Sequence, residues 1–182
     1  MDEDEPGELV DGQLVEEEMP NFAHESTVGW LIQHLRVWVV PQGGAVGGSE
    51  GKLKVTDKRG RKADVFVYLP GTRRPRARDS LLTFPPDILV EVVSPRPRDV
   101  RRDRVEKTSE YAAFGVRYYW IVDPWVRSLE IMELGADGRY VRALDAADGT
   151  ITAVPGCAGL TLDLDALWAE LDRLDADDAA EK

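Results

Sequence analysis

The sequence is poor in residues that cross-link a chain or anchor it in a membrane. Its 182 residues include one cysteine, Cys157, and two histidines. A single thiol cannot form an internal disulfide or a cysteine-type zinc site, so Cys157 fits a small apolar filler. The apolar run at residues 88–93 is about a third of the roughly 20 residues that a transmembrane helix needs, and the acidic start is unlike a secretory signal. We therefore expect a cytoplasmic protein without a membrane segment.

The chain also lacks an overall excess of positive charge. Its 34 acidic and 23 basic side chains give a net charge of −11, which argues against a nucleic-acid binder whose whole surface is basic. The charge is segregated, however, because residues 52–107 hold 16 basic and 8 acidic side chains, which gives +8 and leaves −19 for the rest. Acidic ends that only keep the protein soluble are the alternative explanation.

Apolar periodicity and turn residues predict a mixed α/β protein. Asp11-Gly12 lies between two short apolar stretches, which indicates a β-hairpin. The other expected elements are a helix over residues 22–39, strands at 53–55, 63–69, 87–93 and 117–122, a basic turn at 57–62, a helix over 99–114 that begins at Asp99, a hairpin over 128–144 and a final strand and helix over 160–174. The helix expected over residues 99–114 lies between the strands at 87–93 and 117–122, which predicts a β-α-β unit with a parallel strand pair.

The length favours a single domain. We expect an acidic, disordered N-terminus at residues 1–7, one domain over residues 8–174, and an acidic, frayed tail at 175–182.

Three charged residues could bring chemistry to this sheet. Glu91 interrupts an apolar run that suits a strand buried on both faces, where an unpaired carboxylate is costly. Asp64 lies in the preceding strand, and Lys107 lies on the helix that follows. Two carboxylates on adjacent strands can share Mg²⁺, and a lysine can assist a metal-bound water or stabilise charge on a phosphate.

Several ordered blocks resemble the Uma-two family of "putative restriction endonucleases". The blocks are residues 9–15 (LVDGQLV), His24, residues 63–67 (ADVFV), residues 86–95 (PDILVEVVSP), residues 103–107 with Tyr111-Ala112, residues 119–124 (YWIVDP), and residues 155–160 with Trp168. The resemblance covers nearly the whole chain. It implies a restriction endonuclease-like PD-(D/E)xK fold: an α+β mixed sheet with helices on its faces, an N-terminal β-hairpin, and an acidic site where two central strands diverge.

The resemblance also implies roles for individual residues. Asp64 corresponds to the first acid of the motif and Glu91 to the second, with the backbone carbonyl of Val92 as a further ligand of Mg²⁺ or Mn²⁺. Val93 stands where the usual motif has lysine, and Lys107 fits an amine supplied from the next helix. Residues expected at the edge of the site are His24, Ser94, Asp103 and Tyr111. Arginines expected to flank it and contact DNA phosphates are Arg73, Arg74, Arg76, Arg78, Arg96, Arg98, Arg101, Arg102 and Arg104.

The resulting hypothesis is a Mg²⁺-dependent DNA endonuclease. Asp64 and Glu91 would hold the metal, and Lys107 would assist the attacking water. Each residue also has a structural interpretation: Asp64 could pair with Arg61-Lys62 at the surface, Glu91 could be a buried structural acid, and Lys107 could be solvated.

The competing hypothesis is a catalytically silent nuclease-fold module that serves in binding or assembly. The missing Glu-x-Lys lysine and the acidic ends favour it. Under either hypothesis we expect a homo-oligomer, with a dimer favoured, because a small nuclease needs two copies to cut both strands of a duplex. The apolar surface of the hairpin around residues 128–140 is the expected contact.

Overall fold

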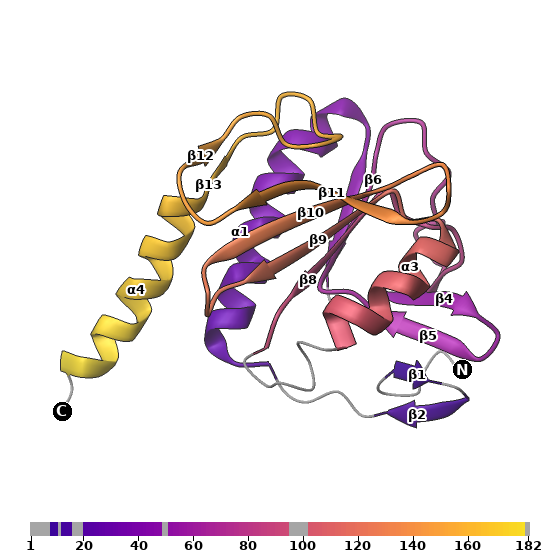
Figure 1. Cartoon of the computed structure of the whole chain (residues 1–182), viewed down its shortest axis with the longest axis horizontal. Helices are drawn as coiled ribbons and strands as arrows, with labels where there is room; N and C mark the ends of the chain where they lie inside the picture. The colour runs from indigo at the N-terminus through magenta and orange to yellow at the C-terminus, as the bar shows by residue number, and fades with distance from the viewer. Residues whose placement is uncertain (1–7, 11, 16–19, 49–50, 95–101, 181–182) are drawn as a thin grey trace.

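A mixed six-stranded sheet forms the centre of the molecule (Figure 1). The computed structural model describes residues 8–10, 12–15, 20–48, 51–94 and 102–180. The strand order is β11-β10-β9-β8-β6-β3, with bounds β3 (Ala45–Gly48), β6 (Val65–Tyr68), β8 (Ile88–Val92), β9 (Tyr118–Asp123), β10 (Ser128–Leu134) and β11 (Tyr140–Ala146). Strands β8 and β9 are parallel and the other neighbours are antiparallel, which confirms the predicted β-α-β unit.

A second sheet of five strands contains the N-terminal hairpin. Its order is β2-β1-β5-β4-β7, with bounds β1 (Glu8–Val10), β2 (Gln13–Val15), β4 (Lys52–Thr56), β5 (Arg59–Lys62) and β7 (Leu81–Leu82). Val10 is paired with Gln13, so the hairpin has the predicted two-residue turn. The predicted basic turn at residues 57–62 is wrong for residues 59–62, because β5 pairs with β1 on one side and with β4 on the other.

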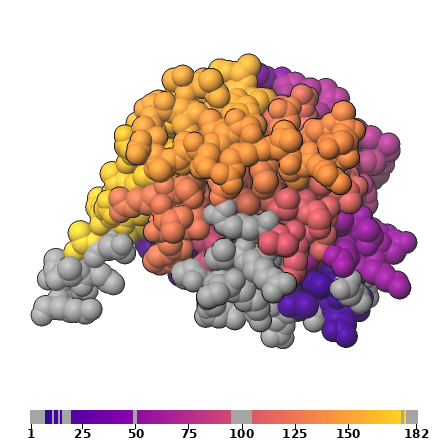
Figure 2. Space-filling view, viewed as in Figure 1, coloured from indigo at the N-terminus to yellow at the C-terminus, as the bar shows by residue number. Residues whose placement is uncertain are grey.

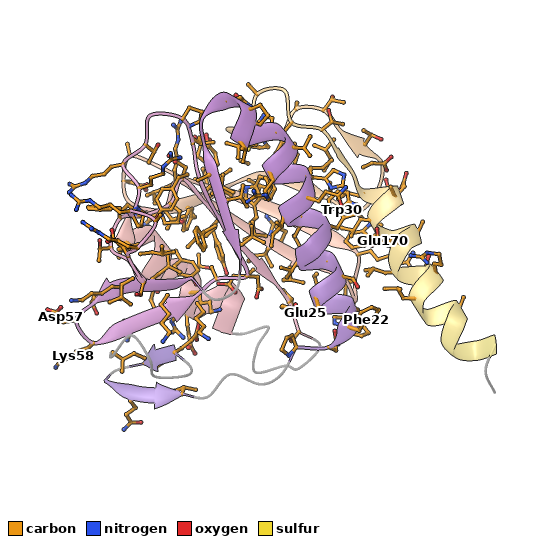
Figure 3. All side chains as sticks on the ribbon, turned by 180° about the vertical axis from the view of Figure 1, so that it is seen from behind. Phe22, Glu25, Trp30, Asp57, Lys58 and Glu170 are labelled. Carbon is orange, nitrogen blue, oxygen red and sulfur yellow. The ribbon has the colours of Figure 1, made fainter. Side chains whose placement is uncertain are left out.

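Helices cover both faces of the central sheet, as the views from its two sides show (Figures 1 and 3). The helical segments are α1 (Phe22–Val39), the 3₁₀ turn η1 (Val40–Gln42), the π-helix η2 (Arg102–Lys107), α3 (Thr108–Phe114) and α4 (Leu164–Ala180); strands β12 (Thr150–Ile151) and β13 (Leu162–Asp163) form a small third sheet. Among the described residues, no helix is long and apolar enough to cross a membrane.

Two of these helices differ from their predicted bounds. The predicted helix over residues 99–114 is a π-helical segment followed by a short α-helix that ends at Phe114 and is capped by Gly115. Its expected start at Asp99 lies outside the described residues. Helix α4 continues through Ala180, past residue 174, where we expected the domain to end.

Strand β8 divides the core into two apolar clusters. Ile88, Val90 and Val92 contribute to the cluster packed against α1 and α4, whereas Leu89 and Val93 contribute to the cluster around α3. All five residues of β8 are buried, as we predicted for a strand covered on both faces. Because β6 and β8 are antiparallel and Val65 lies opposite Val90, the start of β6 and the end of β8 meet at one edge of the sheet. This edge carries Asp64 and Glu91.

Candidate active site

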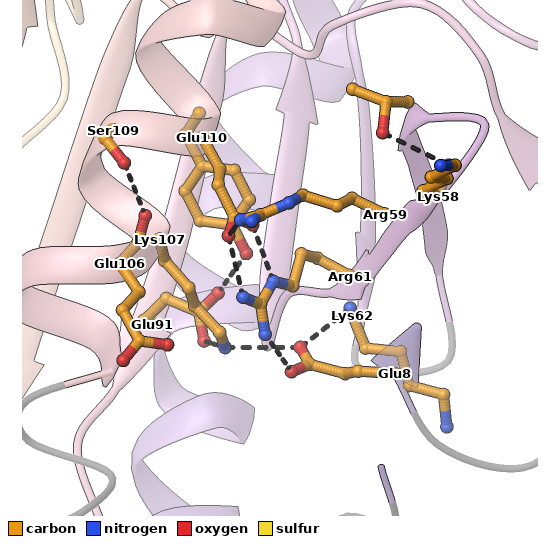
Figure 4. Close-up of polar contacts among 12 residues, drawn as sticks. Glu8, Lys58, Arg59, Arg61, Lys62, Glu91, Glu106, Lys107, Ser109 and Glu110 are labelled. Carbon is orange, nitrogen blue, oxygen red and sulfur yellow. Dashed lines mark hydrogen bonds and ion pairs between the residues drawn. The ribbon is translucent and has the colours of Figure 1, made fainter. Parts of the chain in front are cut away.

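Glu91 is buried near the end of β8 and is engaged by two side chains from the following helical segments (Figure 4). Lys107 Nζ donates to Glu91 Oε2 at 2.8 Å, and Tyr111 Oη donates to Glu91 Oε1 at 2.6 Å. Lys107 is the last residue of η2, and Tyr111 lies one turn later in α3. The helical segments therefore bring the Lys107 amine to Glu91, and Lys107 is buried rather than solvated.

Asp64 is held by a backbone amide of the neighbouring strand and by the first helix. Its Oδ2 accepts a hydrogen bond from the Val92 amide at 2.7 Å and lies 3.3 Å from His24 Nε2. The suggested surface pairing with Arg61 is wrong, because the Arg61 guanidinium binds two other carboxylates. Asp64 is instead tied to the residue that directly follows Glu91.

His24 lies between two carboxylates in the first turn of α1. Asn21 caps this helix by accepting a hydrogen bond from the His24 amide at 2.9 Å, and the ring contacts the Asp64 carboxylate. The side chain is 9% exposed, and Nδ1 lies 3.5 Å from Glu25 Oε1. Burial lowers the pKa of His24, but the hydrogen bond and charge of Asp64, together with Glu25, outweigh burial and raise this pKa above its ordinary value.

The predicted site residues come together as two pairs, His24 with Asp64 and Lys107 with Glu91. Across the part of the chain that the structure describes, no group of three or more histidine, cysteine or acidic side chains is arranged to hold a metal ion. Carboxylate oxygens are hard ligands, and Mg²⁺ is often held by one or two carboxylates plus waters. The oxygen donors at this edge are of the type that a hard divalent cation takes, and Lys107 already binds Glu91.

For two further residues expected at the edge of the site, Ser94 and Asp103, the described part of the structure gives the position along the chain but no contact with the site. Ser94 is half-buried and lies beyond the end of β8, three residues after Glu91. Asp103 belongs to η2, but its side chain lies outside the described part of the chain.

Sequence reasoning missed three buried charged residues that continue from Lys107. Glu8 of β1 lies 3.5 Å from Lys107 Nζ through Oε1 and 2.8 Å from Arg61 Nη1 through Oε2. Arg61 also donates to both carboxylate oxygens of Glu110 in α3, at 2.7 and 2.9 Å, and Arg59 binds the same carboxylate. Three acids and three bases therefore alternate along one ion-pair chain (Figure 4): Glu91, Lys107, Glu8, Arg61, Glu110 and Arg59.

The arginine loop between β6 and β7 does not flank this site, contrary to our prediction. Arg74 donates to the carbonyl of Gly43, beyond the C-terminal end of α1, and Arg73 stacks on Phe84 with 3.9 Å between its guanidinium carbon and the ring centroid. His24 lies at the other end of α1, whose 18 residues span about 27 Å. Arg76 and Arg78 belong to the same exposed loop. Arg96, Arg98 and Arg101, and the side chains of Arg102 and Arg104, lie outside the described parts of the chain.

Comparison with known proteins agrees with this architecture. The family model Uma2, described as "Putative restriction endonuclease", matches residues 1–165. No curated protein matches the chain. A crystal structure of "a putative nuclease belonging to DUF820" from Anabaena variabilis ATCC 29413 is 18% identical, covers 89% of each chain and has a TM-score of 0.71, a likeness that shows a shared fold. The chain belongs to the Uma2 family of putative restriction endonucleases and has a restriction endonuclease-like fold.

Proposed function

We propose that this protein is a Mg²⁺-dependent endonuclease that hydrolyses phosphodiester bonds in DNA, with Mn²⁺ as a substitute metal. Asp64 and Glu91 hold the metal, and the carbonyl of Val92 is a further ligand. The observation that carries the proposal is the 2.8 Å contact between Lys107 and Glu91. Position 93, where the usual motif has lysine, is a valine, and Lys107 offers the missing amine from the next helix. Family membership supports the same reaction class.

The residues at the sheet edge have different roles in this proposal, which follow from their chemistry. A bound divalent ion would neutralise charge on the phosphate and activate a water. Asp64 is preorganised for this role because the Val92 amide and His24 fix its carboxylate. Lys107 offers a cation beside Glu91, where it can orient the attacking water or stabilise the negative charge that develops on the phosphate.

A catalytically silent binding module is the second candidate. Its support is that both oxygens of Glu91 already have partners, Lys107 and Tyr111, so that Glu91 could be a structural acid. The two candidates differ in metal binding. Calorimetric titration with Mn²⁺ should give saturable binding that Asp64→Asn abolishes; a protein that binds no metal would favour the module.

Cleavage of DNA tests the catalytic roles directly. We expect the wild type to cut duplex or single-stranded DNA with Mg²⁺ or Mn²⁺, and Asp64→Asn and Lys107→Met each to lose about 100-fold or more in rate, because each removes a charged group from the reacting centre. Glu170→Gln, which changes an exposed acid on α4 (Figure 3), is the matched control and should cleave at the wild-type rate. Cleavage that persists in both site variants would contradict this mechanism.

We also propose that the active form is a dimer that contacts itself through the β10–β11 hairpin. Figure 2 shows this hairpin, in orange, spread over one face of the molecule. Val141 on β11 is 58% exposed, although Leu129 and Ile131 on β10 are buried. Sedimentation velocity of the wild type and Val141→Lys tests this: the variant should shift toward monomer, and a wild type that is monomeric at all concentrations would rule the dimer out.

A further inference from the structure

The N-terminal hairpin places a carboxylate beside the amine of the candidate site. Glu8 is the first residue of β1, and its side chain is 2% exposed. It reaches the site because Leu9 pairs with Gly60 of β5, which makes the hairpin part of the second sheet. Lys107 Nζ thereby lies between two carboxylates, Glu91 at 2.8 Å and Glu8 at 3.5 Å.

This arrangement bears on how Glu91 could bind a cation. If Glu91 binds a metal ion, its negative charge no longer fully offsets the positive charge of Lys107. An uncompensated charge in a buried position is destabilising. Glu8 offers Lys107 a second anion at the moment when Glu91 is shared.

We propose that Glu8 is a positioning residue of the candidate site: it holds Lys107 beside Glu91 and gives that cation an alternative carboxylate, so that Glu91 can accept a divalent ion. The metal-binding part of this inference rests on the proposed function, whereas the hold of Glu8 on Lys107 does not. Glu8 does not contact the substrate in this proposal and acts through Lys107.

Glu110 provides a matched control for Glu8. Both are buried acids that bind the Arg61 guanidinium at hydrogen-bond distance, so each isosteric amide removes one negative charge from the same ion-pair chain. Their other contacts differ: Glu8 lies beside Lys107 and accepts a hydrogen bond from the Lys62 amide at 3.2 Å, whereas Glu110 lies beside Arg59 and takes a second hydrogen bond from Arg61. A purely structural role in the ion-pair chain predicts no difference in Mn²⁺ affinity between the two variants.

The test measures Mn²⁺ affinity by calorimetry for the folded wild type, Glu8→Gln and Glu110→Gln. We expect both variants to lower the unfolding temperature, but only Glu8→Gln to weaken Mn²⁺ binding, by about tenfold or more, as for other residues that orient metal ligands. With Mg²⁺, Glu8→Gln should lower kcat for DNA cleavage and leave KM nearly unchanged. Equal Mn²⁺ affinity in the two variants would overturn the proposal.

A second measurement separates this inference from the proposed function. A double-mutant cycle on the unfolding of metal-free protein uses Glu8→Gln, Lys107→Met and the double variant. If Glu8 holds Lys107, the two substitutions are non-additive. Additive effects would contradict the contact between Glu8 and Lys107, whether or not the protein binds metal. Coupled effects in a protein that binds no Mn²⁺ would support the contact but would contradict both the nuclease mechanism and the metal-binding role of Glu8.

Discussion

At the scale of single residues, opposite charges in buried positions determine the chemistry of the sheet edge. His24 shows this most clearly, because burial opposes its charged form while Asp64 and Glu25 favour it, and the carboxylates prevail. A histidine whose pKa is raised on folding stabilises the folded protein most when it is protonated in both states. Its contribution is therefore fully present below the unfolded-state pKa and is lost as the pH rises through the folded-state pKa.

Replacing His24 with glutamine should reveal this pH dependence. At about pH 6 and below, His24→Gln should lower the free energy of unfolding by roughly 1.5 kcal/mol, a typical value for a hydrogen bond to a charged group. This loss of stability should shrink as the pH rises from about 6.5, the pKa of an unperturbed histidine, through the higher pKa of His24 in the folded protein. Denaturant unfolding in the presence of a chelator measures it. In an Asp64→Asn background the pH dependence should largely disappear; a loss that grows with pH would contradict the assignment.

At the scale of elements, local signals predicted most of the fold. The Asp11-Gly12 turn, the helix that ends before Pro41 and the strand around Glu91 are each encoded within a few neighbouring residues, and each is present as a hairpin, α1 and β8. Strand β5 was not predictable in the same way, because its sequence Arg-Gly-Arg-Lys is typical of a turn and it forms a strand only through pairing with β1 and β4.

The same limit applies to the candidate site. Glu91 and Lys107 were identifiable because a charged residue stood out in an apolar strand and the next helix offered an amine. Arg61 looked like an ordinary charged residue, since its partners Glu8 and Glu110 lie 53 and 49 positions away in the sequence. Only tertiary structure brings these charges together in one ion-pair chain, which is buried except at Arg59.

The cap of α1 links helix stability to the site. Asn21 Oδ1 accepts a hydrogen bond from the amide of His24, so Asn21→Ala should lower the free energy of unfolding by about 1 kcal/mol and loosen the placement of His24. Chemical denaturation measures the loss. Asn21→Ser retains a capping oxygen and should preserve most of the stability; equal losses in the alanine and serine variants would show that the cap is not the cause.

At the scale of the whole molecule, folding reduces the basic surface that the sequence suggested. Within the basic window of residues 52–107, Arg61 and Lys107 are buried in ion pairs and Lys52 is only 9% exposed. The arginine loop lies toward the far end of α1 from His24. Net charge is −11, so the DNA binding that the proposed function requires would depend on a few local contacts rather than on long-range attraction.

Salt dependence of DNA binding tests where those contacts are. The logarithm of the affinity should fall with the logarithm of the salt concentration, with a slope of about 0.9 per phosphate contacted. Because Arg102 and Arg104 belong to the same segment as Lys107, their double alanine variant should reduce the slope by about one per residue removed. Arg73→Ala/Arg74→Ala is the matched control, with the same change in charge, and should leave the slope almost unchanged. Fluorescence anisotropy measures the affinity, and a chelator that removes divalent metal prevents cleavage during the titration. A reduced slope in the loop variant alone would place the DNA across the C-terminal end of α1 and would separate binding from the proposed site.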